Sequence, residues 1–151
     1  RSSGRSQYES VGGGGEGPYP NFTSYVASKG GVMRLSETAA EELRDFNVDV
    51  NVIAPGSVNT KFLDVLLEAG PEKAGRANYE RSLKQKENGG VPAEKAADLA
   101  VFLASDASDG LSGKIISAVR DDYLKFPERL KELMSSDVYT WRRIKPKDGN
   151  A

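Results

Sequence analysis

Tyr25 and Lys29 are two side chains that can do chemistry together, because they lie four residues apart in one helix-like segment. At that spacing the two side chains lie one above the other on a single helix face. A lysine ammonium beside a phenol favours the phenolate, so we expect the pKa of Tyr25 to fall from about 10 towards neutral. Such a phenol can give a proton to a carbonyl, or take one from an alcohol, near physiological pH. The alternative is an ordinary surface pair worth a few tenths of a kcal/mol.

The residues around this pair predict the helix that holds it and a buried strand behind it. A Gly/Pro-rich loop over residues 1–21 precedes a helix that we expect from residue 22 or 24 to about residues 45–47. Apolar residues recur along that helix at helical spacing, at Val32, Leu35, Ala39 and Leu43. Residues 48–54 alternate valine with polar residues and end at Pro55-Gly56, which is typical of a short strand closed by a turn.

The rest of the chain continues the alternation of helices and strands. We expect helices over about 60–69, 71–88, 92–105 and 121–134, a strand over 114–119 and a strand-like tail over 138–144. Pro127 interrupts the last helix or marks a fresh start. This order predicts an α/β fold in which long crossovers join parallel strands.

The stretch from Gly17 to Thr60 resembles the catalytic half of the short-chain dehydrogenase/reductase family in the order and spacing of its elements. The resemblance implies that Tyr25 is the general acid/base at the substrate oxygen. It also implies that Lys29 lowers the pKa of that tyrosine and hydrogen-bonds the nicotinamide ribose.

The same resemblance implies a cofactor, NAD or NADP, and the residues that would hold it. Pro55 and Gly56 would shape the loop over the nicotinamide. The backbone of Val58 would contact the carboxamide, and the hydroxyl of Thr60 would meet the carboxamide or the phosphates. Taken alone, Pro55-Gly56 is equally consistent with a plain turn after a strand.

A serine of this family lies a dozen or so residues before the tyrosine and hydrogen-bonds the substrate oxygen. The candidate here is Ser10, fifteen positions before Tyr25. The alternative is a loop hydroxyl without a role. Arg5–Glu9, which precedes the serine, lacks the aliphatic run of a buried parallel strand.

Gly12, Gly14 and Gly17 satisfy the pattern G-x-G-x-x-G, which in dinucleotide-binding folds cradles a pyrophosphate. That fingerprint needs a buried strand before it and a helix start after it. Polar residues precede these glycines, and a Pro-Tyr-Pro segment follows them. We therefore predict a loop beside the active site, where backbone can approach a substrate closely, and no phosphate cradle.

Two segments typical of the family's nucleotide-binding half, Thr-Gly-x-x-x-Gly-x-Gly and Asn-Asn-Ala-Gly, do not occur in the sequence. We therefore expect the C-terminal portion of a Rossmann-like doubly wound parallel sheet, with the N-terminal nucleotide-binding half missing. The expected divisions are a Gly/Pro-rich loop over 1–21, a catalytic half-domain over 22–119 and a helical and strand-like extension over 120–151. The extension is expected to cover the cleft or to pack on a neighbouring subunit.

Residues 60–90 correspond to the place where the family builds its substrate lid. Four residues in this stretch could line an apolar pocket, namely Leu63, Leu66, Leu67 and Tyr79. The alternative for all four is ordinary core packing.

Composition excludes several classes of function. The 151 residues carry a net charge of −1, which gives no electrostatic footprint for nucleic acid or an acidic membrane. The sequence has no cysteine and no histidine, so we expect no disulfide, no Ser-His-Asp relay and no metal site. It has no run of 18 apolar residues and no apolar signal core, so we expect a cytoplasmic protein with no membrane partner.

These observations together predict an NAD(P)-dependent oxidoreductase that acts on a small-molecule carbonyl or alcohol and forms a homo-oligomer, a dimer or tetramer, if the full fold is present. The isolated chain is expected to have little or no activity. The alternative is a truncated, non-catalytic chain that acts as an oligomerisation or interaction module, because the long helix and final strand of this family often form subunit interfaces.

Overall fold

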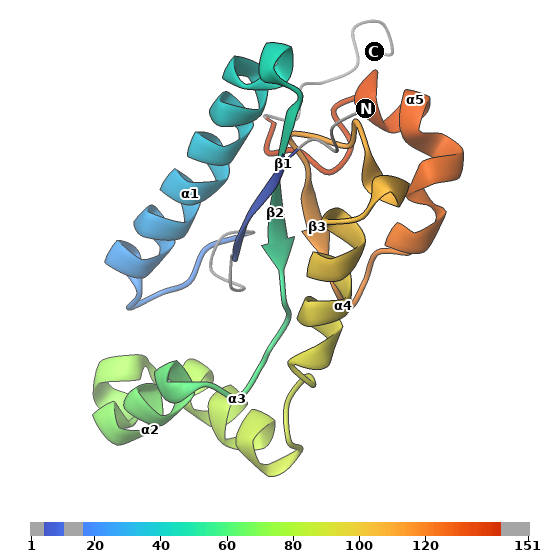
Figure 1. The fold of residues 1–151 in the computed structure, drawn as a ribbon. Coiled ribbons are helices and arrows are strands. Elements are labelled where there is room, and N and C mark those ends of the chain that lie inside the picture. Colours follow the sequence, from blue (N-terminus) through green and yellow to red (C-terminus); the bar gives the residue numbers. More distant parts are fainter. Residues whose placement is uncertain (1–4, 11–16, 143–151) are drawn as a thin grey trace, which may run out of the picture.

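The computed structural model describes residues 5–10 and 17–142, and its centre is a sheet of three parallel strands. These are β1 (Arg5–Ser10), β2 (Val48–Ala54) and β3 (Ile115–Ser117), in the order β1-β2-β3. The strands lie together in the middle of Figure 1, with helices to either side. The prediction of an α/β fold with parallel strands is confirmed.

The first strand shows that the prediction of a loop over residues 1–21 is wrong for residues 5–10. β1 pairs with β2 along its whole length, from Arg5 opposite Val48 to Ser10 opposite Ile53. Backbone groups make these pairs whatever the side chains are, and strand propensity depends on such context. The lack of aliphatic residues over Arg5–Glu9 therefore did not exclude a strand there.

α1 (Thr23–Glu42) covers one face of the sheet and contains Tyr25 and Lys29 in its first two turns. Met33 of this helix is buried against Val52 of β2. The chain then passes through a 3-10 helix, Arg44–Phe46, and turns into β2 at Asn47, whose φ of 55° is left-handed. The predicted helix and the predicted strand over 48–54 are both confirmed.

α4 (Glu94–Leu103) covers the opposite face of the sheet. Ile53 follows Val52 in β2 and packs on this second side, because successive side chains of a strand alternate between its faces. The main core lies here and is formed by Ile53, Leu99, Phe102, Leu103, Leu111, Ile116, Ala118, Phe126 and Leu133. The sheet is therefore the middle layer between two helical layers.

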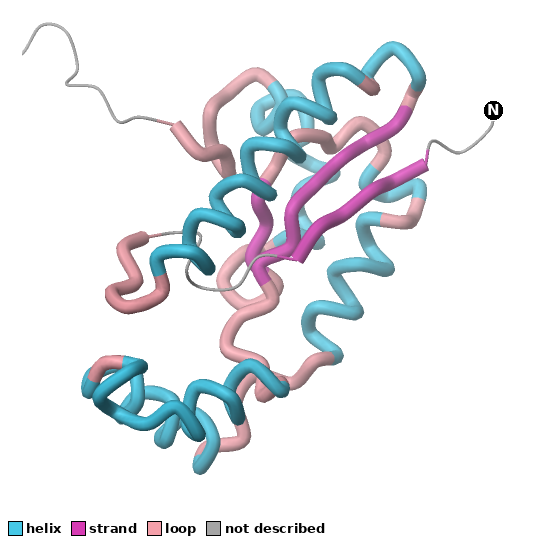
Figure 2. The backbone as a smooth tube through the Cα atoms, turned by 90° about the vertical axis from the view of Figure 1, so that its left-hand side faces the viewer, coloured by secondary structure: helices cyan, strands magenta, loops and turns pink. Residues whose placement is uncertain are grey.

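α2 (Lys61–Ala74) and α3 (Arg76–Glu87) form a pair of helices beyond the carboxyl end of β2, at the bottom of Figure 1. Figure 2 shows the same pair set apart below the strands. Non-helical backbone at Gly70, with φ 76° and ψ 170°, interrupts α2 where the sequence predicts a break. Along the described residues, none of the helices combines the length and apolar character that a membrane crossing needs.

The described part of the C-terminal extension folds back onto the rest of the chain. A 3-10 helix (Tyr123–Arg129) contains Pro127 and leads into α5 (Leu130–Met134), so the helix predicted over 121–134 is divided. Residues 138–142 do not form the predicted strand, since Tyr139 has a left-handed φ of 56°. Residues 143 and 144 lie outside the described residues.

A buried carboxylate fixes this extension to α1. Glu37 is 7% exposed and forms ion pairs with Arg34 and with Arg142, the latter at 2.7 Å. The backbone N–H of Trp141 also donates to Glu37, at 3.3 Å. The extension therefore packs on the helix of its own chain that carries Tyr25.

Candidate active site

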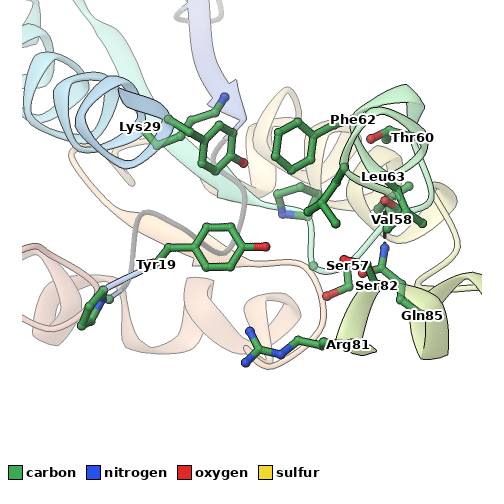
Figure 3. Close-up of a pocket in the computed structure, with 16 residues that line it drawn as sticks. Tyr19, Lys29, Ser57, Val58, Thr60, Phe62, Leu63, Arg81, Ser82 and Gln85 are labelled. Atoms are coloured by element: carbon green, nitrogen blue, oxygen red, sulfur yellow. Dashed lines mark hydrogen bonds between the residues drawn. The ribbon is translucent and has the colours of Figure 1, made fainter. Parts of the chain in front are cut away.

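A cavity of about 450 Å3 lies at the carboxyl end of β2, between the start of α1 and the α2–α3 pair. The carboxyl edge of a parallel sheet is where α/β folds bind their ligands. Figure 3 shows the side chains that converge there. They include Tyr19, Tyr25, Lys29, Pro55, Gly56, Ser57, Val58, Thr60, Phe62, Arg81 and Gln85.

Tyr25 and Lys29 share this cavity. Both line it from the first two turns of α1, and Nζ of Lys29 lies 5.8 Å from the centre of the Tyr25 ring. An ammonium at that distance is attracted by the electron-rich face of the ring. The four-residue spacing thus places both predicted side chains at one site.

The pKa of Tyr25 differs in direction from the sequence-based expectation. Burial raises the pKa above the ordinary value of 10.0, and the neighbouring Tyr19 raises it further. The Tyr25 ring stacks on Phe62, with ring centres 4.9 Å apart and planes inclined by 19°. Removal of water from around the phenol disfavours the phenolate, so the prediction that Lys29 brings this pKa towards neutral is wrong for this structure.

Aromatic rings surround the candidate general acid. Tyr19 meets Tyr25 edge-on at 6.5 Å and stacks on Phe22 at 4.5 Å, while Phe22 meets Phe62 edge-on at 6.0 Å. Offset and edge-to-face rings attract each other through their quadrupoles. The four rings therefore form one wall, which we call the aromatic wall: Tyr19, Phe22, Tyr25 and Phe62.

Pro55 and Gly56 form the turn that follows β2, as predicted. Gly56 has a φ of 83°, in the left-handed region that glycine tolerates best. A Cβ atom there would lie 2.8 Å from a methyl group of Val119 and 3.2 Å from one of Val91. The position therefore requires glycine for two reasons, the left-handed backbone and the lack of room for a Cβ atom.

Val58 and Thr60 line the cavity beyond this turn. The backbone N–H of Val58 donates to the carbonyl of Gly56 at 3.0 Å, and its carbonyl accepts from Gln85 at 3.3 Å. Thr60 stands at the N-cap of α2 and its hydroxyl makes no capping hydrogen bond. A hydroxyl at a helix start is well suited to an anionic or amide group of a ligand.

Ser10 is the last residue of β1 and pairs in register with Ile53, one residue before the end of β2. Parallel strands end at the same edge of a sheet, so Ser10 lies at the edge that leads to Pro55. Of the three glycines in the loop after it, Gly17 lines the cavity. Gly12 and Gly14 lie outside the described residues.

Only two of the four residues predicted to line a pocket from the lid do line this cavity. Leu63 and Leu66 are buried and line it, whereas Leu67 and Tyr79 do not. Sequence reasoning missed several lining residues, namely Tyr19, Ser57, Phe62, Arg81, Ser82 and Gln85. Helical spacing carries a signal for the last three, because Gln85 lies four residues after Arg81 and three after Ser82 in α3.

Comparison with known families gives a match over most of the chain. The family model described as enoyl-(acyl carrier protein) reductase matches residues 9–118. The matched segment runs from the end of β1 to the residue after β3 and includes all of the cavity's lining residues.

Curated relatives match about two thirds of the chain. The chain is 39% identical over 99 residues to a 3-oxoacyl-[acyl-carrier-protein] reductase of Thermotoga maritima, which is 64% of this chain and 37% of that protein. It is 38% identical over 101 residues to 3beta-hydroxysteroid dehydrogenase 1 of Eggerthella lenta, which is 64% of this chain and 35% of that protein. The aligned part of this chain thus spans little more than a third of these relatives' length.

Solved structures share the fold. A short-chain dehydrogenase family protein of Francisella tularensis superposes with a TM-score of 0.61 at 24% identity, over 76% of this chain and 49% of that one. YwfH, an NADPH-dependent reductase of bacilysin biosynthesis, superposes with a TM-score of 0.58 at 25% identity, over 74% of this chain and 44% of that one. About three quarters of this chain therefore shares its fold with these two structures.

Proposed function

This chain belongs to the short-chain dehydrogenase/reductase family, and we propose that it supplies the catalytic residues of a nicotinamide-dependent oxidoreductase that interconverts a carbonyl and an alcohol. The observation that carries the proposal is the shared cavity of Tyr25 and Lys29 at the carboxyl edge of the sheet. Two relatives, named as a reductase and a dehydrogenase, agree with this reaction class.

Tyr25 is the proton donor to the carbonyl oxygen in this proposal. Its pKa lies above 10.0, so the hydroxyl is protonated at neutral pH, as a general acid for carbonyl reduction must be. Lys29 carries a positive charge near the ring and so favours the phenolate that forms as the proton leaves. Ser10, at the end of β1, would donate a hydrogen bond to the same oxygen.

The residues after β2 fit a nicotinamide cofactor. Gly56 gives the turn after β2 its left-handed backbone, and the Thr60 hydroxyl at the start of α2 is not used for capping. Pro55 and Gly56 would shape the loop beside the ring, and the carbonyl of Val58 has a second lone pair for a carboxamide. When bound, NAD or NADP supplies or accepts the hydride.

The remaining parts of the proposal concern the protein as a whole. β1 is an edge strand of this sheet, so its outer side is open to further parallel strands, which would carry the nucleotide-binding half of the family fold. We propose a small-molecule carbonyl or alcohol as substrate, a homo-oligomer as the working form and the cytoplasm as its location.

Reduction of a panel of ketones and aldehydes with NADH and with NADPH tests this function. We expect at most a low rate from the isolated chain, and we expect Tyr25→Phe to remove that rate because the proton donor is lost. Tyr79→Phe is the matched control, since Tyr79 lies in α3 and does not line the cavity. Equal rates in the chain and in Tyr25→Phe would contradict the proposal and favour the non-catalytic interaction module.

A further inference from the structure

The charged side chains that line the cavity are both cationic. Lys29 lies beside Tyr25, and Arg81 reaches the cavity from α3. Among the described residues, no aspartate or glutamate lines this space. Positive charge on the wall of a cavity attracts anions, more strongly where the walls exclude water.

Arg81 has no side-chain partner among the described residues, in contrast to four other arginines of the fold. Within residues 5–10 and 17–142 its guanidinium forms no hydrogen bond and no ion pair. Four other arginines each pair with a glutamate: Arg34, Arg44, Arg129 and Arg142. No protein carboxylate of the described residues competes for this guanidinium. It can therefore form a bidentate pair with a carboxylate or phosphate of a ligand.

The position of Arg81 relative to the aromatic wall sets the shape of such a ligand. Figure 3 shows the hydroxyl of Tyr19 and the guanidinium of Arg81 directed into the same space, from two sides of the cavity. The stacked rings of Tyr25 from α1 and Phe62 from α2 line the same cavity, and buried Leu63 and Leu66 add apolar surface. A ligand that filled this space would be apolar in its middle and charged at the α3 end.

We propose that the substrate is a carbonyl compound with an apolar or aromatic body and an anionic group, and that Arg81 is the specificity residue that binds this group. The inference rests on the proposed function in one respect only, that the carbonyl lies at Tyr25. The anion is a carboxylate or a phosphate ester, since both match the guanidinium.

Binding without cofactor tests the inference separately from catalysis. The probes are 4-oxo-4-phenylbutanoate against its methyl ester, and phenacyl phosphate against 2-hydroxyacetophenone, each titrated by calorimetry. A charge-assisted bidentate contact predicts that at least one anionic probe binds about tenfold tighter than its neutral partner. The probe that shows this preference identifies the anion. Equal affinity within both pairs overturns the inference.

Substitutions assign the preference to Arg81. We expect Arg81→Gln to remove the preference for the anion and Arg81→Lys to keep part of it, while binding of the neutral probe changes little. Lys84→Gln is the matched control, because Lys84 is an exposed cation of the same helix that does not line the cavity. A preference that survives Arg81→Gln, or one that Lys84→Gln removes equally, overturns the inference.

Two further measurements separate this inference from its alternatives. If Arg81→Gln weakens binding of NADH or NADPH and leaves the anion preference unchanged, the guanidinium serves the cofactor and the inference is wrong. Turnover of the neutral methyl ester tests the proposed function instead, because it needs Tyr25 and does not need Arg81. The two proposals can therefore fail independently of each other.

Discussion

The ring of Tyr25 stacks on that of Phe62, with centres 4.9 Å apart and planes 19° from parallel. The first residue belongs to α1 and the second to the first turn of α2, so this contact joins the helix that carries the candidate acid to the helical pair below the sheet. The same ring removes water from around the phenol. The contact with Phe62 thus both positions Tyr25 and contributes to the burial that raises its pKa.

Replacing Phe62 is expected to change the acidity of Tyr25. In Phe62→Leu the stacked ring is lost, water reaches the phenol, and the pKa of Tyr25 falls towards its ordinary value because burial is the main cause of the rise. Titration of 13Cζ-labelled tyrosines by NMR measures this shift. Phe46→Leu is the control, since Phe46 is 74% exposed in the 3-10 helix that follows α1. An unchanged titration of Tyr25 in Phe62→Leu would show that burial by this ring is not the cause.

The raised pKa also predicts the pH dependence of the reaction. Carbonyl reduction needs the protonated phenol, so its rate should stay level from about pH 6 to about pH 9 and fall only as the pH rises through the pKa of Tyr25. Alcohol oxidation needs the phenolate, so its rate should increase with pH throughout that range. Steady-state rates in both directions measure the two profiles. A reduction rate that halves near neutral pH would indicate a tyrosine pKa lowered by Lys29.

A methyl group at Gly56 is expected to destabilise the fold. Gly56→Ala forces an alanine to a φ of 83° and places its Cβ 2.8 Å from Val119, at a cost of about 1–3 kcal/mol. Gly31→Ala is the matched control, because Gly31 lies in α1 with open space around it, and there alanine should stabilise by about 0.5–1 kcal/mol. Urea unfolding of the three proteins gives these free energies. Equal stability of the two variants would contradict the close approach at the turn.

Loss of the charge on Glu37 is expected to release the extension from α1. Glu37→Gln removes a buried carboxylate that pairs with Arg34 and Arg142, and we expect a loss of about 1–3 kcal/mol in the free energy of unfolding. The control is Glu41→Gln, since the pair of Glu41 with Arg44 is exposed and should change stability by less than about 0.5 kcal/mol. Hydrogen exchange along residues 130–142 should rise only in the first variant. Unchanged exchange there would show that another contact holds the extension.

The sequence predicted the fold where side-chain patterns are strong. Alternating valines identified β2, and the apolar repeat from Val32 to Leu43 identified α1. The polar segment Arg5–Ser10 carries no such pattern, because it is held by backbone pairing to β2, and the prediction there was wrong. The tail at 138–142 contains strand-forming residues, yet the left-handed backbone at Tyr139 ends any strand.

The candidate site was predicted where spacing alone brings residues together. Four positions along a helix suffice to join Tyr25 and Lys29. The direction of the tyrosine pKa was not predictable, because it depends on burial of the phenol. Phe62, which stacks on the ring, is 37 positions away in the sequence and in contact only after folding. The same holds for Arg81, whose place in the cavity depends on how α3 packs against α2.

Transfer of deuterium from cofactor to product tests the central claim most directly. The chain is incubated with 4-deuterated NADH or NADPH and a carbonyl compound, and deuterium on the carbinol carbon is followed by mass spectrometry. The account predicts transfer that falls by about 100-fold or more in Tyr25→Phe, as loss of a general acid requires, and that persists in Tyr79→Phe. Measurable transfer that continues at the same rate in Tyr25→Phe would contradict the account.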